Sequence, residues 1–427
     1  MLPINQQLRR KLWRLALAVV AGSPALARAQ LPPPDLVLSE PRQALLELGP
    51  VDFHVRATTS FVYDDNINLH DNTTTGGIDT SGKPLKSKDD FIFTFAPGLI
   101  LSQPPTLDAT RTTWSLDYTP AFIYFLKNDQ ENSVDQNVQA RAGYALTKLT
   151  LGLSASYVKT AGGVVDVGSR VSQNNYGVAT TARYEMTEKT FFQIDGSYTL
   201  TDYETLTDSQ EWTVIPTVNY QISSKVTLGL GLTAGQLYVD QQASEQVGTN
   251  TVIVIRTEPQ NYIGPTFKVS YRTTEKTDVS LSLGAEWRTY PDGRTALKPV
   301  FALAGSYRPF EGTAFSVEGH QRIENSAVIS GADYITTGAS VSVRQRLYNR
   351  LSGTFSATYV HSAYEPVSAG VTTTRVDDYL LLRTGLEATL GRNWTVGVFY
   401  LYRQDVSTDQ SYSFQDNQVG LQAAWTY

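Results

Sequence analysis

The sequence predicts an all-β fold, a transmembrane antiparallel up-and-down β-barrel of about 18 strands (about 16–20), with short periplasmic turns and long extracellular loops. Three observations lead to this expectation. A secretory leader opens the chain, two-residue alternation of apolar and polar side chains runs from near residue 51 to the end, and short turns alternate with longer polar loops. We therefore expect a single barrel, 51–427, in the bacterial outer membrane of a Gram-negative cell.

Residues 1–29 have the layout of a secretory signal peptide. A cationic stretch, 9–14, precedes an apolar run, 15–21, and a small-residue site, 27–29, follows. Cleavage is expected after Ala29. The apolar run is much shorter than the roughly 20 residues that a membrane-spanning helix needs.

The charge balance argues against a nucleic-acid partner. The chain has 35 basic and 41 acidic residues, and the leader holds five of the basic ones and no acidic one. The mature chain is therefore acidic, at −11 (30 basic against 41 acidic), whereas nucleic-acid binding needs a clustered basic surface. The sequence has no Cys, which excludes disulfides and thiolate chemistry.

The segment 30–50 is the part outside the predicted barrel. It starts with three consecutive prolines, which stiffen a chain. Ser39, Pro41 and the leucines that follow, up to Gly49, predict a short periplasmic helix. This segment is too small for the plug domain of an energised transporter, which favours passive passage.

Alternation defines the strands and favours a membrane barrel over a soluble sandwich. It is clear over 149–158, 226–234 and 279–287. The polar positions are mostly Ser, Thr, Gly, Asn and Gln, and the apolar positions are almost free of charge. A soluble sheet would instead place Lys and Glu on its solvent face.

The connections alternate in length, as expected when both termini are periplasmic. Short turns are predicted near 147–148, 187–189, 223–225, 273–276, 309–312, 348–350 and 391–393. Longer loops are predicted at 64–90, 127–136, 159–175, 201–210, 239–260, 289–295, 324–333, 361–377 and 403–416.

Aromatic residues on the apolar register predict two membrane-interface girdles. One set lies beside the short turns: Tyr144, Tyr184, Tyr220, Tyr271, Tyr307 and Trp394. The other lies beside the long loops: Tyr157, Tyr198, Trp287, Tyr359 and Tyr402. The alternative is cross-strand aromatic pairing in a soluble sheet.

Four prolines interrupt this regular pattern. Because proline cannot donate to a strand ladder, we expect bulges or strand starts at these positions. They are Pro97, Pro216, Pro265 and Pro299.

The last strand resembles the signal by which the barrel assembly machinery recognises its clients. Alternate apolar residues lead back from an aromatic C-terminus: Val419, Leu421, Trp425 and Tyr427. This resemblance implies the assembly machinery as a partner, beside outer-membrane lipid and lipopolysaccharide.

Short motifs at both ends of the barrel resemble a known family. Residues 63–67, Tyr-Asp-Asp-Asn-Ile, close the first strand, and residues 416–421 open the last. With the loop-proximal prolines, they resemble the outer-membrane β-barrel porins often associated with exopolysaccharide export loci. The resemblance covers 51–427 and implies an outer-membrane channel, in some members linked to polysaccharide secretion.

A barrel of about 16–18 strands leaves an aqueous channel, so the functional residues are sought on the inward register. The charged and titratable residues predicted to line the lumen are Arg56, Asp117, Arg141, Arg183, Arg272, Glu286, Arg288, Arg308, Glu318, His320, Arg322, Arg344 and Arg383. Their excess of cations predicts a preference for anions. Alternatively, these charges pair across strands and only keep the wall wetted. Arg272, Arg308 and Arg344 lie near short turns, where we expect fewer acidic neighbours.

No catalytic site and no cofactor are predicted. Glu318, His320, Arg322 and Arg344 are expected to lie close together, and a paired lumen network is the favoured interpretation of this group. Asp64, Asp65 and Asn66 offer the oxygen ligands that calcium prefers. The favoured interpretation there is a turn, so no metal is predicted.

The function expected from the sequence is passive passage of hydrophilic solutes, with saccharides or an exported exopolysaccharide as candidates. The alternative is a barrel that acts through its extracellular loops as an adhesin, receptor or envelope scaffold.

Overall fold

The computed structural model describes residues 45–49, 51–70, 85–103, 111–247, 250–274, 276–368 and 371–427. The leader lies outside these residues. The described chain is built from strands and two short 3-10 helices, and none of its helices is long and apolar enough to cross a membrane. The strands are β1 (Leu46–Leu48), β2 (Val51–Asp64), β3 (Asp90–Ser102), β4 (Thr112–Tyr118), β5 (Ala121–Phe125), β6 (Ser133–Ala145), β7 (Leu149–Val164), β8 (Ser169–Glu185), β9 (Thr190–Tyr203), β10 (Ser209–Gln221), β11 (Val226–Val247), β12 (Asn250–Thr274), β13 (Thr277–Thr289), β14 (Thr295–Tyr307), β15 (Thr313–Asn325), β16 (Ala332–Tyr348), β17 (Leu351–Pro366), β18 (Val376–Leu390), β19 (Trp394–Ser407) and β20 (Phe414–Thr426). The 3-10 helices are η2 (Asp129–Glu131) and η3 (Gln410–Tyr412).

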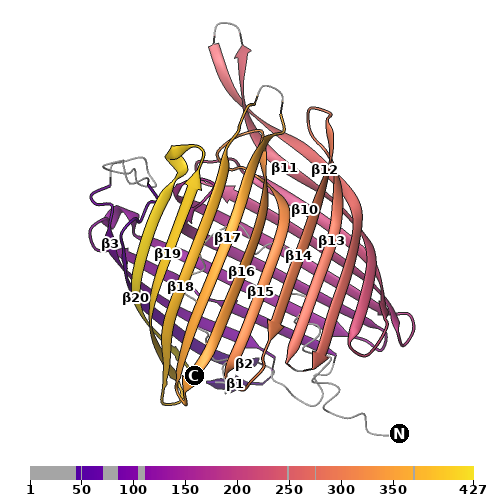
Figure 1. The fold of residues 1–427 in the computed structure, drawn as a ribbon, viewed down its shortest axis with the longest axis vertical. Helices are drawn as coiled ribbons and strands as arrows, with labels where there is room; N and C mark the ends of the chain where they lie inside the picture. The colour runs from indigo at the N-terminus through magenta and orange to yellow at the C-terminus, as the bar shows by residue number, and fades with distance from the viewer. Residues whose placement is uncertain are drawn as a thin grey trace.

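These strands form one closed antiparallel barrel (Figure 1). Each wall strand pairs with the next along the chain, and β2 pairs with β20 to close the cylinder. β4 and β5 both lie between β3 and β6, so they form one wall strand, broken at Thr119 and Pro120. Counted in this way, β2 to β20 make 18 wall strands. The predicted fold class and strand number are confirmed.

The seven predicted short turns all join consecutive strands at one end of the barrel. Two predicted long loops are wrong. Residues 159–175 are mostly strand, because β7 and β8 continue to a tight turn at 165–168. Residues 239–260 belong to the β11–β12 hairpin, which continues to Val247 and projects beyond the barrel rim (Figure 1). Alternation of apolar and polar residues is lost over these two segments, although the hydrogen-bonded ladders continue.

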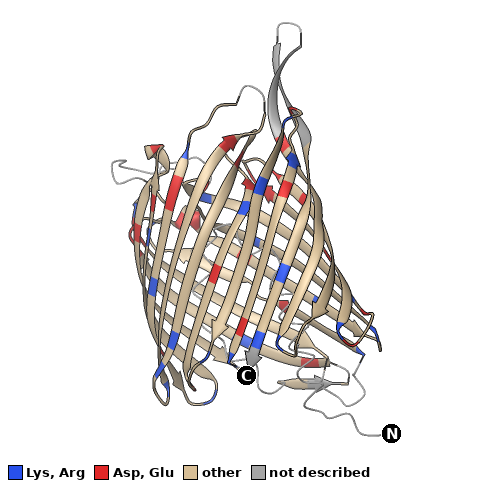
Figure 2. Cartoon of the chain, turned by 45° about the vertical axis from the view of Figure 1, so that its right-hand side comes forward, with Lys and Arg blue, Asp and Glu red and all other residues tan. Residues whose placement is uncertain are grey.

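The outward face is apolar over the middle of the wall. Leu230 and Leu421 are among the most exposed apolar side chains, at 68% and 61%. Large apolar groups remain exposed in this way where lipid covers them. The aromatic set beside the short turns lies near strand ends, where Tyr184 and Tyr220 are exposed. In the set assigned to the long loops, Trp287 lies near a strand end and is exposed, whereas Tyr157, Tyr359 and Tyr402 lie well inside β7, β17 and β19. Most residues of the wall strands are uncharged, as the tan colour of the strands in Figure 2 shows.

The four strand prolines produce neither bulges nor strand starts, so that expectation is wrong. At Pro97, Pro216 and Pro265 the ladder to the following wall strand is interrupted, and near Pro299 it ends at Phe301, while the ladder to the preceding strand is continuous in all four cases. Around Pro216, for example, the partners Val214–Ala234 and Thr217–Gly231 keep one register across the gap. The missing N–H therefore removes bonds on one side without shifting the strand.

The start of the described chain also differs from expectation. Leu46–Leu48 form strand β1, which pairs with the first residues of β2 through a turn at Gly49. Gly49 has a positive φ of 59°, which favours glycine. The helix expected here is therefore wrong for 45–49, and its remainder lies outside the described residues.

Candidate functional site

The predicted lumen charges are mostly paired with acids. Arg56 on β2 contacts Asp117 on β4 at 2.8 Å, passing over the intervening strand β3. Arg183 and Arg288 each pair with a glutamate two residues away on the same strand, Glu185 at 2.8 Å and Glu286 at 3.0 Å. Further pairs are Arg272–Asp278 at 2.6 Å, Arg344–Glu387 at 2.9 Å, Lys268–Asp195 at 3.2 Å and Lys298–Glu365 at 2.5 Å, together with Arg322–Glu324.

This pairing overturns one expectation and supports another. Arg272 and Arg344 both have acidic partners, which contradicts the expectation that cations near the short turns have fewer acidic neighbours. Arg308 is exposed and has no ion pair among the described residues. Arg141 donates to Gln139 at 3.1 Å, and Arg383 lies over the Phe399 ring at 4.7 Å. Most of the predicted lumen charges are thus paired with acids, as in the alternative that the sequence left open.

The group expected around His320 does not assemble. Arg322 hydrogen-bonds Glu324, and Arg344 forms an ion pair with Glu387. Glu318 is exposed, and Nε2 of His320 is buried without a hydrogen bond. These four side chains therefore do not form a catalytic constellation.

At the outer end of the barrel, two segments contact distant parts of the wall, which the sequence did not predict. One is the turn 164–168 between β7 and β8, and another is the segment 66–70 that follows β2. We call these two segments the outer lid. Val165 of the turn and Leu69 of the segment pack in one apolar cluster with Tyr379 and Phe414.

The turn 164–168 crosses the mouth from one wall to the opposite one. β8 and β17 are nine strands apart in a wall of 18, so they face each other across the lumen. Asp166 of the turn nevertheless accepts a hydrogen bond from the Tyr364 hydroxyl of β17 at 2.8 Å. It also accepts bonds from Ala327 N at 2.8 Å and from Ser326 Oγ at 3.1 Å, in the β15–β16 loop.

Arg375, just before β18, makes several contacts that hold this turn in place. Its Nη1 donates to the backbone oxygen of Asp166 at 2.8 Å, and its Nη2 donates to Asp377 at 2.6 Å. The guanidinium also lies 3.5 Å from the centre of the Tyr412 ring. Arg375 is 4% exposed. A buried guanidinium with this many partners holds the turn in place. We call the contact between Asp166 and Arg375 the latch.

Burial raises the pKa of Asp166 above its ordinary value, although the bonds from Ala327 and Tyr364 and the charge of Arg375 act in the opposite direction. The docked lid therefore favours the protonated form of this carboxyl more than an undocked lid would.

The segment 66–70 is also held in place by several contacts. Leu69 is fully buried and has a positive φ of 56°, a strained backbone state for a leucine. Asn66 Nδ2 donates to Gln415 O at 2.8 Å, and Arg170 N donates to Asn68 Oδ1 at 3.3 Å. Such strain persists only where surrounding contacts determine the position.

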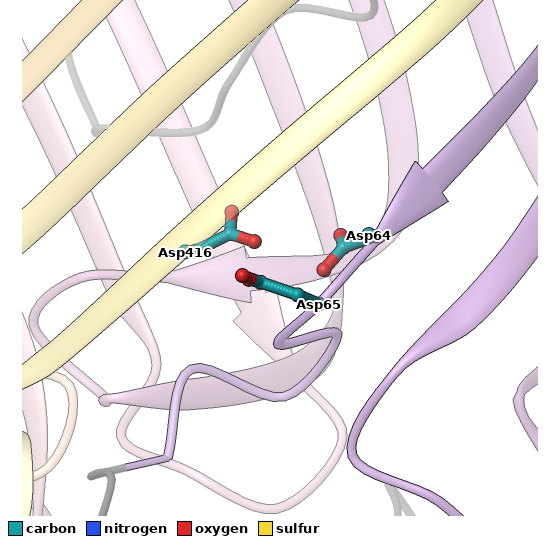
Figure 3. A group of neighbouring side chains, drawn as sticks. All are labelled: Asp64, Asp65 and Asp416. Carbon is teal, nitrogen blue, oxygen red and sulfur yellow. The ribbon is translucent and has the colours of Figure 1, made fainter.

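Three carboxylates gather where this segment leaves the wall (Figure 3). Asp64 ends β2, Asp65 follows it, and Asp416 lies on β20; one oxygen of each lies within 4.8 Å of the others. Asn66, the third weak calcium candidate, instead bonds backbone oxygens through its amide. The sequence placed Asp64 and Asp65 together, but the contribution of Asp416 depends on barrel closure.

The sequence did not predict the contacts of the outer lid, because the two residues of each contact lie far apart in the chain. Asp166 and Arg375 both fell in predicted loops, and nothing local connects them. The one available signal was the Asp-Val-Gly sequence at 166–168, which is typical of a tight turn and whose Gly168 has a positive φ of 66°.

The C-terminal part of the wall matches a known family model. Residues 263–427 match the model described as "Putative beta-barrel porin 2". This is an outer-membrane β-barrel. The match confirms the resemblance to outer-membrane barrel porins that the end motifs indicated. No curated protein gives a significant sequence match.

Solved structures similar to this outer-membrane barrel include other barrels. The copper transporter OprC has a TM-score of 0.46 and 8% identity, over 90% of this chain and 82% of OprC. OpdO of Pseudomonas aeruginosa has a TM-score of 0.43 and 11% identity, over 88% and 97% of the two chains. OccAB2 of Acinetobacter baumannii has a TM-score of 0.44 and 11% identity, over 88% and 98%. Likeness at this level says nothing about the solute of this barrel.

Proposed function

We propose that this barrel is a porin-like channel for passive passage of hydrophilic solutes, with its outer mouth narrowed by the outer lid. The observation that supports the proposal is a wall of 18 strands whose inward charges are held in ion pairs such as Arg56–Asp117 and Lys268–Asp195. A barrel of this size leaves an aqueous lumen. Paired charges keep that lumen wet without binding an ionic solute tightly.

The lid sets the size limit in this proposal. Apolar packing around Leu69 and the Asp166 contacts occupy the outer end of the lumen. Small sugars are therefore the saccharides that fit the docked lid. Passage of an exopolysaccharide chain requires the turn 164–168 to leave the mouth.

The test is conductance of the purified mature barrel in planar bilayers, compared with Arg375→Ala. Breaking a buried ion pair by removing one partner costs about 3–5 kcal/mol, so this change should release the turn. We expect a small conductance in the wild type and a several-fold larger one in Arg375→Ala. Arg294→Ala is the matched control, because Arg294 is an exposed arginine of the same outer end, paired with Asp292.

Liposome swelling with sugars of graded size gives the second reading. Arg375→Ala should admit larger sugars than the wild type or Arg294→Ala. If both wild type and Arg375→Ala are folded and neither conducts, the channel proposal is wrong. The receptor or adhesin alternative would then be favoured, supported by the β11–β12 hairpin that projects beyond the rim.

A further inference from the structure

The seam between the first and last wall strands brings three carboxylates together at the outer end. Asp64 and Asp416 are buried, at 4% and 0% exposure, and Asp65 is half-buried. One oxygen from each lies within 4.8 Å of the other two. Oxygens bound to one calcium ion at about 2.3–2.6 Å can be no farther apart than about 5 Å. The three side chains therefore have the spacing of ligands to a single ion.

Hydrogen bonds orient these carboxylates from behind. Asn66 N donates to Asp64 at 2.8 Å, and Gln418 Nε2 donates to the other oxygen of Asp64 at 2.9 Å. Asn417 donates to both oxygens of Asp65, from its backbone N at 2.7 Å and from Nδ2 at 2.8 Å. Partners of this kind fix the direction of metal ligands. The three carboxylate groups lie close to one another (Figure 3).

Asp416 supplies the second and independent observation. Its Oδ2 accepts bonds from Arg403 and from Gln418, whereas its Oδ1 is buried and has no hydrogen-bond partner. A buried carboxylate oxygen without a partner is costly. A cation bound between the three side chains removes that cost.

The charge balance of the three carboxylates also favours a bound cation. Three carboxylates face one guanidinium, since the ion pair described in this group is Arg403–Asp416. With all three carboxyls ionised, this one guanidinium leaves two negative charges without an ion pair in a mostly buried place. A divalent cation balances them. The donor set is all oxygen, which suits calcium or magnesium and not a thiolate- or imidazole-seeking metal.

We propose that Asp64, Asp65 and Asp416 bind one calcium ion at the outer end of the seam. Calcium accepts irregular, flexible oxygen shells, whereas magnesium demands a near-ideal octahedron. Asp65 is half-buried, so water completes the shell on its side. The ion ties β2 to β20 where segment 66–70 turns into the mouth.

Calcium titration of the folded, EDTA-treated barrel in detergent tests this site. Isothermal titration calorimetry should give one calcium ion per chain, with a Kd near or below the range of about 10⁻⁴–10⁻³ M that is typical of extracellular sites. Terbium, as a luminescent calcium substitute, should bind and be displaced by calcium. Magnesium at equal concentration should not displace it.

The variants are Asp65→Asn and Asp64→Asn, each expected to weaken calcium binding at least tenfold. Asp65→Asn keeps the buried Arg403–Asp416 pair, so it should fold. Asp129→Asn is the control, an exposed outer acid paired with Lys86 outside the cluster. Heat-modifiable gel migration shows that each variant is folded.

Absence of saturable calcium binding to the folded wild type would overturn the proposal. So would full affinity in both folded variants, or displacement of calcium by equal magnesium. Binding is measured without conductance, so a failure of the channel proposal does not affect this result.

Discussion

Asp166 links the lid to pH through its buried carboxyl. Docking raises its pKa above the ordinary value of 3.8, chiefly through burial. Between that value and the raised pKa, the docked lid binds more protons than the undocked lid. Docking is therefore strongest at acidic pH, weakens as pH rises through the raised pKa, and levels off above it.

We thus expect acidification to lower single-channel conductance by favouring the docked lid. Asp166→Asn should remove this pH dependence and keep the lid docked. Its amide can accept from Ala327 N and donate to the hydroxyls of Ser326 and Tyr364, which now donate to Asp166. Recording at stepped pH from 7 to about 4, near the ordinary carboxyl pKa, checks this. An unchanged pH profile in the folded Asn variant would show that other groups govern the response.

At the scale of the strand, the two faces of β13 should tolerate charge very differently. Leu283, in the middle of the strand, points outward and is 44% exposed. Leu283→Arg should destabilise the barrel by about 2–4 kcal/mol because it places a charge in the middle of the lipid. Ser280, three residues away, is exposed on the opposite face.

Ser280→Arg is the matched control and should have little effect on stability, since its guanidinium enters the lumen. Urea unfolding of both variants in lipid vesicles measures the difference. Equal losses of unfolding free energy would contradict the assignment of the two faces.

An element can be predicted from the sequence where its structure depends on residues that are close together in the chain. Alternation and short turns such as 187–189 predicted the strand number and the periplasmic ends, because both are set by neighbouring residues. β7 and β8 ran past their predicted ends, because hydrogen-bonded ladders continue without alternation. The Asp166–Arg375 latch was not predictable, because it joins opposite walls that only the closed cylinder brings together.

At the scale of the whole molecule, we expect the ion pairs of the wall to set the preference of the proposed channel between cations and anions. We expect the wild-type pore to show only weak preference between cations and anions, because lumen cations such as Arg272 and Arg344 have acidic partners. Arg308, beside the short turn 309–312, is exposed and has no ion pair among the described residues. Arg308→Gln should move the reversal potential in a salt gradient towards cations.

The control for this prediction removes a whole pair. Arg272→Gln combined with Asp278→Asn leaves the net charge unchanged and should leave the reversal potential unchanged. The measurement belongs at or below about 0.1 M salt, where the Debye length is about 10 Å. A strong anion preference in the wild type would mean that the lumen field survives the pairing.

Closure at the β2–β20 seam has a consequence for the order of folding. Asp65 and Asn417, which bond across it, are 352 residues apart in the chain. Contacts so distant form slowly, after the local hairpins. The cylinder must close before the turn 164–168 can meet its partners on the opposite wall. Lid docking should therefore be the final kinetic phase of refolding, and a barrel stalled with an unzipped seam should already contain its hairpins but no docked lid.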